Sequence, residues 1–134
     1  MQGTANRLRA TRADPPGKAS DEGPRRETYA AALQQFDDLM AAAAAIGPVS
    51  RPLPLYYAIV QAGKAIAAAW TPGDDWRTGG HGLTEDYRAE WQRDILRFRV
   101  KPSVTRKWGP GLFGAVAAKL GSARLIGSAE LGAL

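Results

Sequence analysis

The residues best suited to acid–base chemistry lie in a short glycine-rich segment. His81 is the only histidine of the 134-residue chain, and Arg77 precedes it with three residues between them. An imidazole acts as a general base near neutral pH when a carboxylate orients it, and four acidic residues lie between positions 74 and 86. This pattern makes Arg77 and His81 candidate catalytic residues. The alternative is that the histidine ring only ties down the loop through hydrogen bonds to the backbone.

The composition gives no indication of metal chemistry. The chain has no cysteine, so disulfides, thiolate ligands and a cysteine nucleophile are excluded. A single imidazole is a poor zinc site, because zinc sites in proteins use three or four side-chain ligands. We therefore expect neither a metal nor a cofactor.

A second group of candidates belongs to the apolar stretch from Leu53 to Trp70. Gln61 and Lys64 lie one helical turn apart in this stretch, and a buried ammonium group costs several kcal/mol unless it is paired. Lys64 therefore either reaches the surface along its alkyl stem or has an acidic or phosphate partner.

Residues around this stretch could complete a site for a phosphate-bearing small molecule. Arg51 stands at the start of the expected helix, where free amides and the helix dipole attract anions. Trp76 beside Arg77 could clamp a nucleotide base. The alternatives are that Arg51 braces a neighbouring loop and that the aromatic rings pack into the core. The ligand-binding candidates are Arg51, Tyr57, Gln61, Lys64 and Trp76.

The formal charge of +5 is concentrated in one segment. Residues 93–107 hold six basic residues and one acidic residue. Within the segment, Arg97, Arg99 and Lys101 alternate with apolar residues, as on the outer face of a strand. Cations spaced in this way could follow an RNA backbone. Charges on an edge strand also protect it against pairing with other chains, so the nucleic-acid patch has a structural alternative.

Periodic apolar residues predict a mainly α-helical fold. Residues 28–46 repeat apolar side chains at helical spacing until Gly47 and Pro48 end the helix. Residues 51–70 are apolar nearly all round, so we expect this helix at the centre of a helical bundle. Helices at 28–46 and 111–120 should cover it on most sides. Residues 71–83 hold many glycines and form a loop.

A small β-ribbon is expected at about residues 95–107. The strand 95–101 would pair with 104–107 after a turn at Pro102 and Ser103. A short helix over 84–92 would have Thr84 as its N-cap, and Ser128 would cap another helix. Residues 1–27 have little to bury and are predicted to be a disordered basic arm, which leaves 28–134 as a single helical domain.

Neither a membrane span nor a secretory signal is expected. Polar residues and glycine interrupt the apolar stretch, and the first 27 residues have no apolar segment of the kind that a signal peptide needs. We therefore predict a cytoplasmic protein.

Several motifs resemble one known family. These are Arg51-Pro52-Leu53-Pro54-Leu55-Tyr56-Tyr57, Gln61-Ala62-Gly63-Lys64-Ala65-Ile66, Trp76-Arg77 and Gly80-His81-Gly82-Leu83. From about residue 28 to the end, the chain resembles the YaaC-like family of uncharacterised bacterial proteins. The resemblance implies no activity. It implies the N-terminal part of a longer protein, and the alanine-, glycine- and arginine-rich composition resembles that of actinobacterial members.

Three functions are compatible with these observations. The first is a YaaC-like interaction or ligand-binding helical module, with a protein partner or a second copy of the chain. The second is an RNA-binding protein or a ribonuclease resembling the HEPN superfamily, whose arginine and histidine have four to six residues between them on a helix. The third is a binder of a small molecule containing phosphate or a nucleotide.

Overall fold

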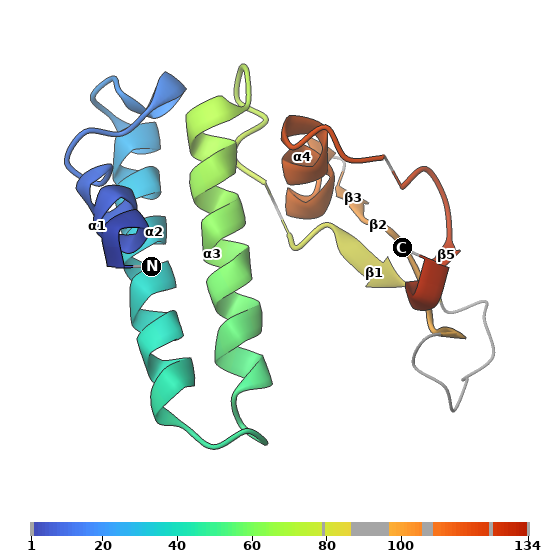
Figure 1. Ribbon diagram of the computed structural model, residues 1–134. Helices are drawn as coiled ribbons and strands as arrows, with labels where there is room; N and C mark the ends of the chain where they lie inside the picture. The colour runs from blue at the N-terminus through green and yellow to red at the C-terminus, as the bar shows by residue number, and fades with distance from the viewer. Residues whose placement is uncertain (1, 79, 87–96, 106–108, 124, 134) are drawn as a thin grey trace. The chain divides into compact units, whose positions relative to one another are not determined.

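The computed structural model is mainly helical and divides into two compact units, Met1–Trp76 and Arg77–Leu134 (Figure 1). It describes residues 2–78, 80–86, 97–105, 109–123 and 125–133. Within these ranges there are four α-helices and a small antiparallel sheet. The predicted fold class is therefore confirmed. The single helical domain expected over residues 28–134 stays a prediction.

The first unit is built on a hairpin of two antiparallel helices, α2 (Pro24–Ala45) and α3 (Pro52–Trp70) (Figure 1). They confirm the helices predicted at 28–46 and 51–70. Helix α2 begins four residues earlier than predicted, since Pro24 stands in its first turn, where a missing amide proton costs nothing.

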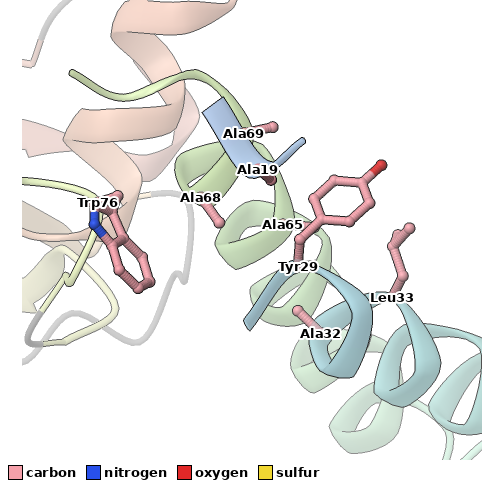
Figure 2. Packing of buried hydrophobic residues seen from close by; sticks show 8 residues of the cluster. All are labelled: Ala19, Tyr29, Ala32, Leu33, Ala65, Ala68, Ala69 and Trp76. Carbon is pink, nitrogen blue, oxygen red and sulfur yellow. The ribbon is translucent and has the colours of Figure 1, made fainter. Parts of the chain in front are cut away.

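Alanines make the contact between the two helices. Ala65, Ala68 and Ala69 of α3 are buried in one cluster with residues of α2 and of the short 3-10 helix η1 (Gly17–Ala19), as Figure 2 shows. Small side chains allow the helix backbones to approach closely. The other members of the cluster are Ala19, Tyr29, Ala32, Leu33 and Trp76.

The sequence predicts that helix α3 is covered on most sides. The structure differs from this prediction. The alanine-rich side of α3 is buried, whereas Leu53 is 63% exposed and Ile59 is 71% exposed. Apolar residues on all sides of the helix predict that all of its sides are buried. This prediction is wrong for the first half of the helix. The other helix that was expected to cover it, α4 (Leu112–Lys119), belongs to the second unit.

Residues 2–23 have more regular structure than the disordered arm expected there. Helix α1 (Gln2–Ala10) leads to η1, whose Ala19 is fully buried. Arg26 donates hydrogen bonds to the carbonyls of Ser20 (2.9 Å) and Ala13 (2.6 Å), and the hydroxyls of Thr11 and Tyr29 lie 2.8 Å apart. The spacing of apolar residues does not predict this structure, because polar contacts attach the segment to α2.

The second unit contains a three-stranded sheet in the order β1-β2-β5, formed by Leu83–Glu85, Arg99–Pro102 and Ala129–Glu130. Both pairings are antiparallel, with Leu83 opposite Pro102 and Arg99 opposite Glu130. A separate pair joins β3 (Val104–Thr105) to β4 (Gly109–Pro110), and helix α4 follows. Helix α4 confirms the prediction for residues 111–120.

The predicted ribbon has the wrong strand partners. Strand β2 pairs with β1 and β5, and residues 104–105 pair with 109–110 instead. The physical reason is that Pro102 and Ser103 do not form a reversing turn: the amide of Ser103 donates to the carbonyl of Gly82 at 2.9 Å and prolongs the β1 pairing. Residues 95 and 96 lie outside the described residues.

Two of the shorter predicted helices also differ from the structure. Thr84 and Glu85 lie in strand β1, so Thr84 is not a helix cap, while residues 87–92 lie outside the described residues. After Ser128 the chain forms β5 and then a 3-10 helix, η3 (Leu131–Ala133), rather than the start of an α-helix. The extended pairing with β2 replaces the helix there.

Candidate functional site

Lys64 is exposed on α3, while Gln61 beside it is partly buried. The charge of Lys64 therefore carries no burial cost, and nothing about its position calls for an acidic or phosphate partner. Of the two readings of this lysine, the arrangement agrees with the one in which the side chain reaches the surface.

Tyr57 and its neighbour Tyr56 lie on the exposed side of the same helix. They are 43% and 45% exposed, and their rings meet edge to face with centroids 5.3 Å apart. They are therefore not core rings, which was the alternative considered for them. Their ring faces and hydroxyls offer apolar and hydrogen-bonding contact to a partner.

Arg51 donates hydrogen bonds back to the helix that precedes it. Its Nε reaches the carbonyl of Ala43 at 3.0 Å and its Nη2 the carbonyl of Ile46 at 3.1 Å. The last carbonyls of a helix have no partner within it and carry its negative dipole end. The guanidinium of Arg51 thus satisfies the C-terminus of α2, in agreement with the bracing alternative rather than with an anion site.

Arg25 has the same role at the other end of the hairpin, and the sequence reasoning missed it. Its Nη1 donates to the carbonyls of Ala68 (3.0 Å) and Thr71 (2.9 Å), and its Nη2 donates to that of Gly73. The partners are 43 to 48 residues away in sequence. In the sequence, only the adjacent pair Pro24-Arg25 indicates this role, because the pair Arg51-Pro52 has the same two residue types in reverse order.

Trp76 belongs to the core of the first unit. Its side chain is only 8% exposed, and the guanidinium carbon of Arg25 lies 5.2 Å from the centre of its ring. This cation–π contact joins the ring to the C-terminal cap of α3. The packing alternative for Trp76 is therefore the one that the geometry supports.

The glycine-rich loop with His81 makes backbone contacts to the N-terminus of α4. The carbonyls of Gly80 and His81 accept hydrogen bonds of 3.1 Å from the amides of Leu112 and Phe113, the first two residues of that helix. The loop carbonyls thus satisfy amides that have no partner within the helix. The motif ties the loop down through its backbone carbonyls.

Glycine is required on both sides of this contact. Gly82 has φ of +92°, and a Cβ placed there would lie 2.8 Å from the Cβ of Phe113. A Cβ on Gly111 would lie 2.7 Å from the amide nitrogen of Gly82. The two backbones therefore approach closely only because neither residue has a side chain.

Arg77 and His81 both belong to the second unit and are exposed. Neither lies in a helix, unlike the arginine and histidine of HEPN nucleases. The ligand candidates Arg51, Tyr57, Gln61, Lys64 and Trp76 belong to the first unit.

Two of the three cations of the predicted nucleic-acid patch have acidic partners. The Nζ of Lys101 lies 3.3 Å from Asp86, and the guanidinium of Arg99 lies 3.9 Å from Glu130. Arg99 also donates to the hydroxyl (3.0 Å) and the carbonyl (3.1 Å) of Ser128. Arg99 therefore secures strand β5 against β2. Arg97, before β2, is exposed.

Metal sites and membrane spans were also considered over the described ranges. No three His, Asp or Glu side chains gather there in a way that could hold a metal ion. No helix in that part of the chain has the length and hydropathy needed to cross a bilayer.

The fold is thus a mainly helical one with a small antiparallel sheet, in which the described arginine contacts hold helix ends and strands. Residues 6–131 match the model of the family described as YaaC-like Protein, and the chain belongs to that family. The match includes most of the N-terminal segment that packs on α2. No curated protein and no solved structure matches the chain. Its actinobacterial origin stays a prediction.

Proposed function

We propose that this YaaC-like protein is a non-catalytic interaction module that binds a protein partner through the end of the α2–α3 hairpin. The proposal rests on one observation, a set of large apolar side chains that are exposed in the turn between the two helices and in the adjoining turns of α2 and α3. We name this surface the hairpin tip. It consists of Met40, Val49, Leu53, Tyr56, Tyr57 and Ile59.

The residues of the hairpin tip are between 41% and 93% exposed. Val49 is 93% exposed at the turn between the helices, and Ile59 is 71% exposed about two helical turns into α3. Single exposed apolar residues are normal, but several within the neighbouring turns of one hairpin favour an interaction surface. Two tyrosines strengthen this reading, because tyrosine is enriched where proteins bind one another.

The residues of the hairpin tip lie outside the buried cluster of the first unit. The buried cluster of the first unit uses the alanines of the other half of α3, from Ala65 onward. Nothing in that cluster requires Leu53 or Ile59 to be large and apolar. A role in binding is what accounts for the choice of residue.

The small-molecule and nuclease alternatives receive less support from the geometry. Arg51, the strongest anion-binding candidate, donates to two backbone carbonyls, and Trp76 is packed in the core. Lys101 and Arg99 face acidic side chains within their own sheet. These cations already contact groups of the protein itself, and a ligand would have to replace those contacts.

Site-specific photo-crosslinking tests the proposal. A photoreactive amino acid at position 59 should give discrete protein adducts in the source cells, and those adducts should disappear when Leu53→Glu is added. The matched control carries the same group at Gln35, which is exposed on α2 outside the hairpin tip. Absence of adducts at position 59, or equal adducts at position 35, would contradict the proposal.

A further inference from the structure

We propose that residues 2–12 form an arm that docks reversibly on helix α2 through polar contacts, while residues 13–23 stay packed against the hairpin. The inference goes beyond the proposed function and does not depend on it, because it involves no residue of the hairpin tip. It is carried by the unequal way in which the two parts of the N-terminal segment are attached.

The second part of the segment is packed into the first unit. Pro15 is fully buried, and Ala19 of η1 lies with no exposed surface in the cluster that also contains residues of α2 and α3. Gly17 lies so close to α3 that a Cβ there would be 2.5 Å from the carbonyl oxygen of Ala69. Close packing and apolar burial hold this part at any ionic strength, because they do not depend on charge.

The first part of the segment has little apolar support. Every residue from Gly3 to Ala10 of α1 is exposed, and Leu8, the largest apolar side chain among them, is 39% exposed. An isolated helix of this length is marginal in water, because its first turn fixes several residues for a single hydrogen bond. Helix α1 therefore depends on its contacts with α2.

Two arginines attach the arm to α2. The Nε of Arg9 lies 3.1 Å from a carboxylate oxygen of Asp37, and these two side chains are 51% and 21% exposed. Arg12 donates a hydrogen bond to the side-chain oxygen of Gln34. Exposed ion pairs contribute little to stability, and salt screens them. Docking of the arm is therefore favourable by only a small margin and should respond to ionic strength.

The arm has a defined point of attachment. Arg26 donates hydrogen bonds to the carbonyls of Ala13 and Ser20, on either side of η1. Just before this point, the hydroxyls of Thr11 and Tyr29 lie 2.8 Å apart. Both hydroxyls can exchange this hydrogen bond for one to water when the arm leaves. Release should therefore stop at Ala13, which Arg26 holds in place.

Release changes the charge that the protein presents. The first 13 residues contain three arginines and no acidic residue. In the docked arm, Arg9 and Arg12 are engaged with Asp37 and Gln34. The arm is thus a conformational device that exchanges contacts within the chain for a cationic segment in solvent, and it uncovers the carboxylate of Asp37 at the same time.

Distance measurements between two spin labels test this inference, and the chain suits them because it contains no cysteine. Labels on Thr4→Cys and Ala31→Cys, at exposed positions of α1 and α2, should give a short distance for the docked arm and a longer, broad one after release. A rise in salt from about 50 mM to about 1 M should increase the released fraction at least about threefold. Labels on Lys18→Cys and Ala31→Cys should keep a single distance, since η1 stays packed.

Charge variants carry the test further. Asp37→Asn and Arg9→Gln each remove one charge of the ion pair, and each should raise the released fraction at low salt to the level that the wild type reaches at high salt. The matched control Asp74→Asn removes an exposed carboxylate of the same unit outside this contact and should leave the released fraction unchanged.

Three results would overturn the inference. One is a single short distance between positions 4 and 31 that neither salt nor the two charge variants change. Another is a broad distribution in the wild type at low salt, which would mean that the arm does not dock. The third is a distance between positions 18 and 31 that spreads together with that of the arm, which would mean that the whole segment detaches.

Discussion

Arg25 and Arg51 lie at opposite ends of the α2–α3 hairpin, and each donates hydrogen bonds to the carbonyls that end the other helix. Each arginine stands next to a proline in the first turn of its own helix, Pro24 or Pro52. The proline starts the helix where a missing amide proton has no cost, and the arginine neutralises the dipole end of the neighbouring helix. The hairpin is thus closed reciprocally at both ends.

Removal of Arg25 should destabilise the first unit. Arg25→Ala leaves the carbonyls of Ala68, Thr71 and Gly73 without their charged donor and removes the contact with Trp76. Hydrogen bonds to charged groups contribute about 1.5–3 kcal/mol each. Because Arg25 is partly exposed, we expect the free energy of unfolding to fall by about 2 kcal/mol in total. Chemical denaturation measures it. Lys64→Ala, an exposed cation of the same hairpin, should change the free energy of unfolding by less than about 0.5 kcal/mol.

The two arginine caps should act independently. They stand at opposite ends of a 19-residue helix, which is about 28 Å long, and they share no carbonyl. The loss of unfolding free energy in the double variant Arg25→Ala/Arg51→Ala should equal the sum of the single losses within about 0.5 kcal/mol. The single loss for Arg51 should be the smaller one, because Arg51 is exposed and makes fewer contacts. If the loss in the double variant differs from the sum of the single losses by more than about 1 kcal/mol, the two ends of the hairpin are coupled.

Glycines 82 and 111 should be irreplaceable in the second unit. Gly82→Ala adds a Cβ against Phe113 and at a φ of +92°, and Gly111→Ala adds one against the backbone of Gly82. Either change should cost about 2 kcal/mol or more of stability, because backbone rather than a flexible side chain must move. Gly127→Ala is the matched control, since a Cβ there meets nothing within 4 Å. Thermal unfolding and the NMR spectrum of the loop amides check the result. Equal stability of all three variants would contradict the close approach of the two backbones.

The helices were predictable from the sequence because their signals are local. Apolar spacing, prolines and glycines define α2, α3 and α4 within a few residues. The exposed side of α3 was not predictable, since composition shows that a helix is apolar but not how many neighbours it has. Strand partners were missed for a similar reason: β2 pairs with β1 and β5 through contacts distant in sequence.

The candidate site shows the same limit. The glycine–histidine–glycine loop stands out in the sequence, and its described contacts with α4 are made by the backbone carbonyls of Gly80 and His81. Arg51 was recognised at the start of α3, and one of its two interpretations agrees with the structure. Arg25 was missed because its partners lie 43 to 48 residues away. Sequence patterns indicate which residues matter more readily than which atoms they use.

The purified chain should leave RNA intact. We expect no difference between the wild type and His81→Ala when each is incubated with total RNA, because the interaction module that we propose needs no catalytic histidine. The lengths of the RNA fragments, resolved on a denaturing gel, are the measurement. Cleavage by the wild type that His81→Ala and Arg77→Ala both abolish would contradict the proposal and restore the nuclease alternative.

The hairpin tip should tolerate polar substitution without loss of stability, unlike the alanine cluster. Ile59→Gln exchanges a 71% exposed apolar side chain for a polar one with good helix propensity, so the free energy of unfolding of the monomer should change by less than about 0.5 kcal/mol. Ala68→Leu, on the buried side of the same helix, forces a large side chain between α2 and α3 and should cost about 1–3 kcal/mol. Chemical denaturation at low micromolar concentration keeps association out of the comparison. A large loss for Ile59→Gln would mean that the residue serves the fold, and the argument that its apolar character serves binding would fail.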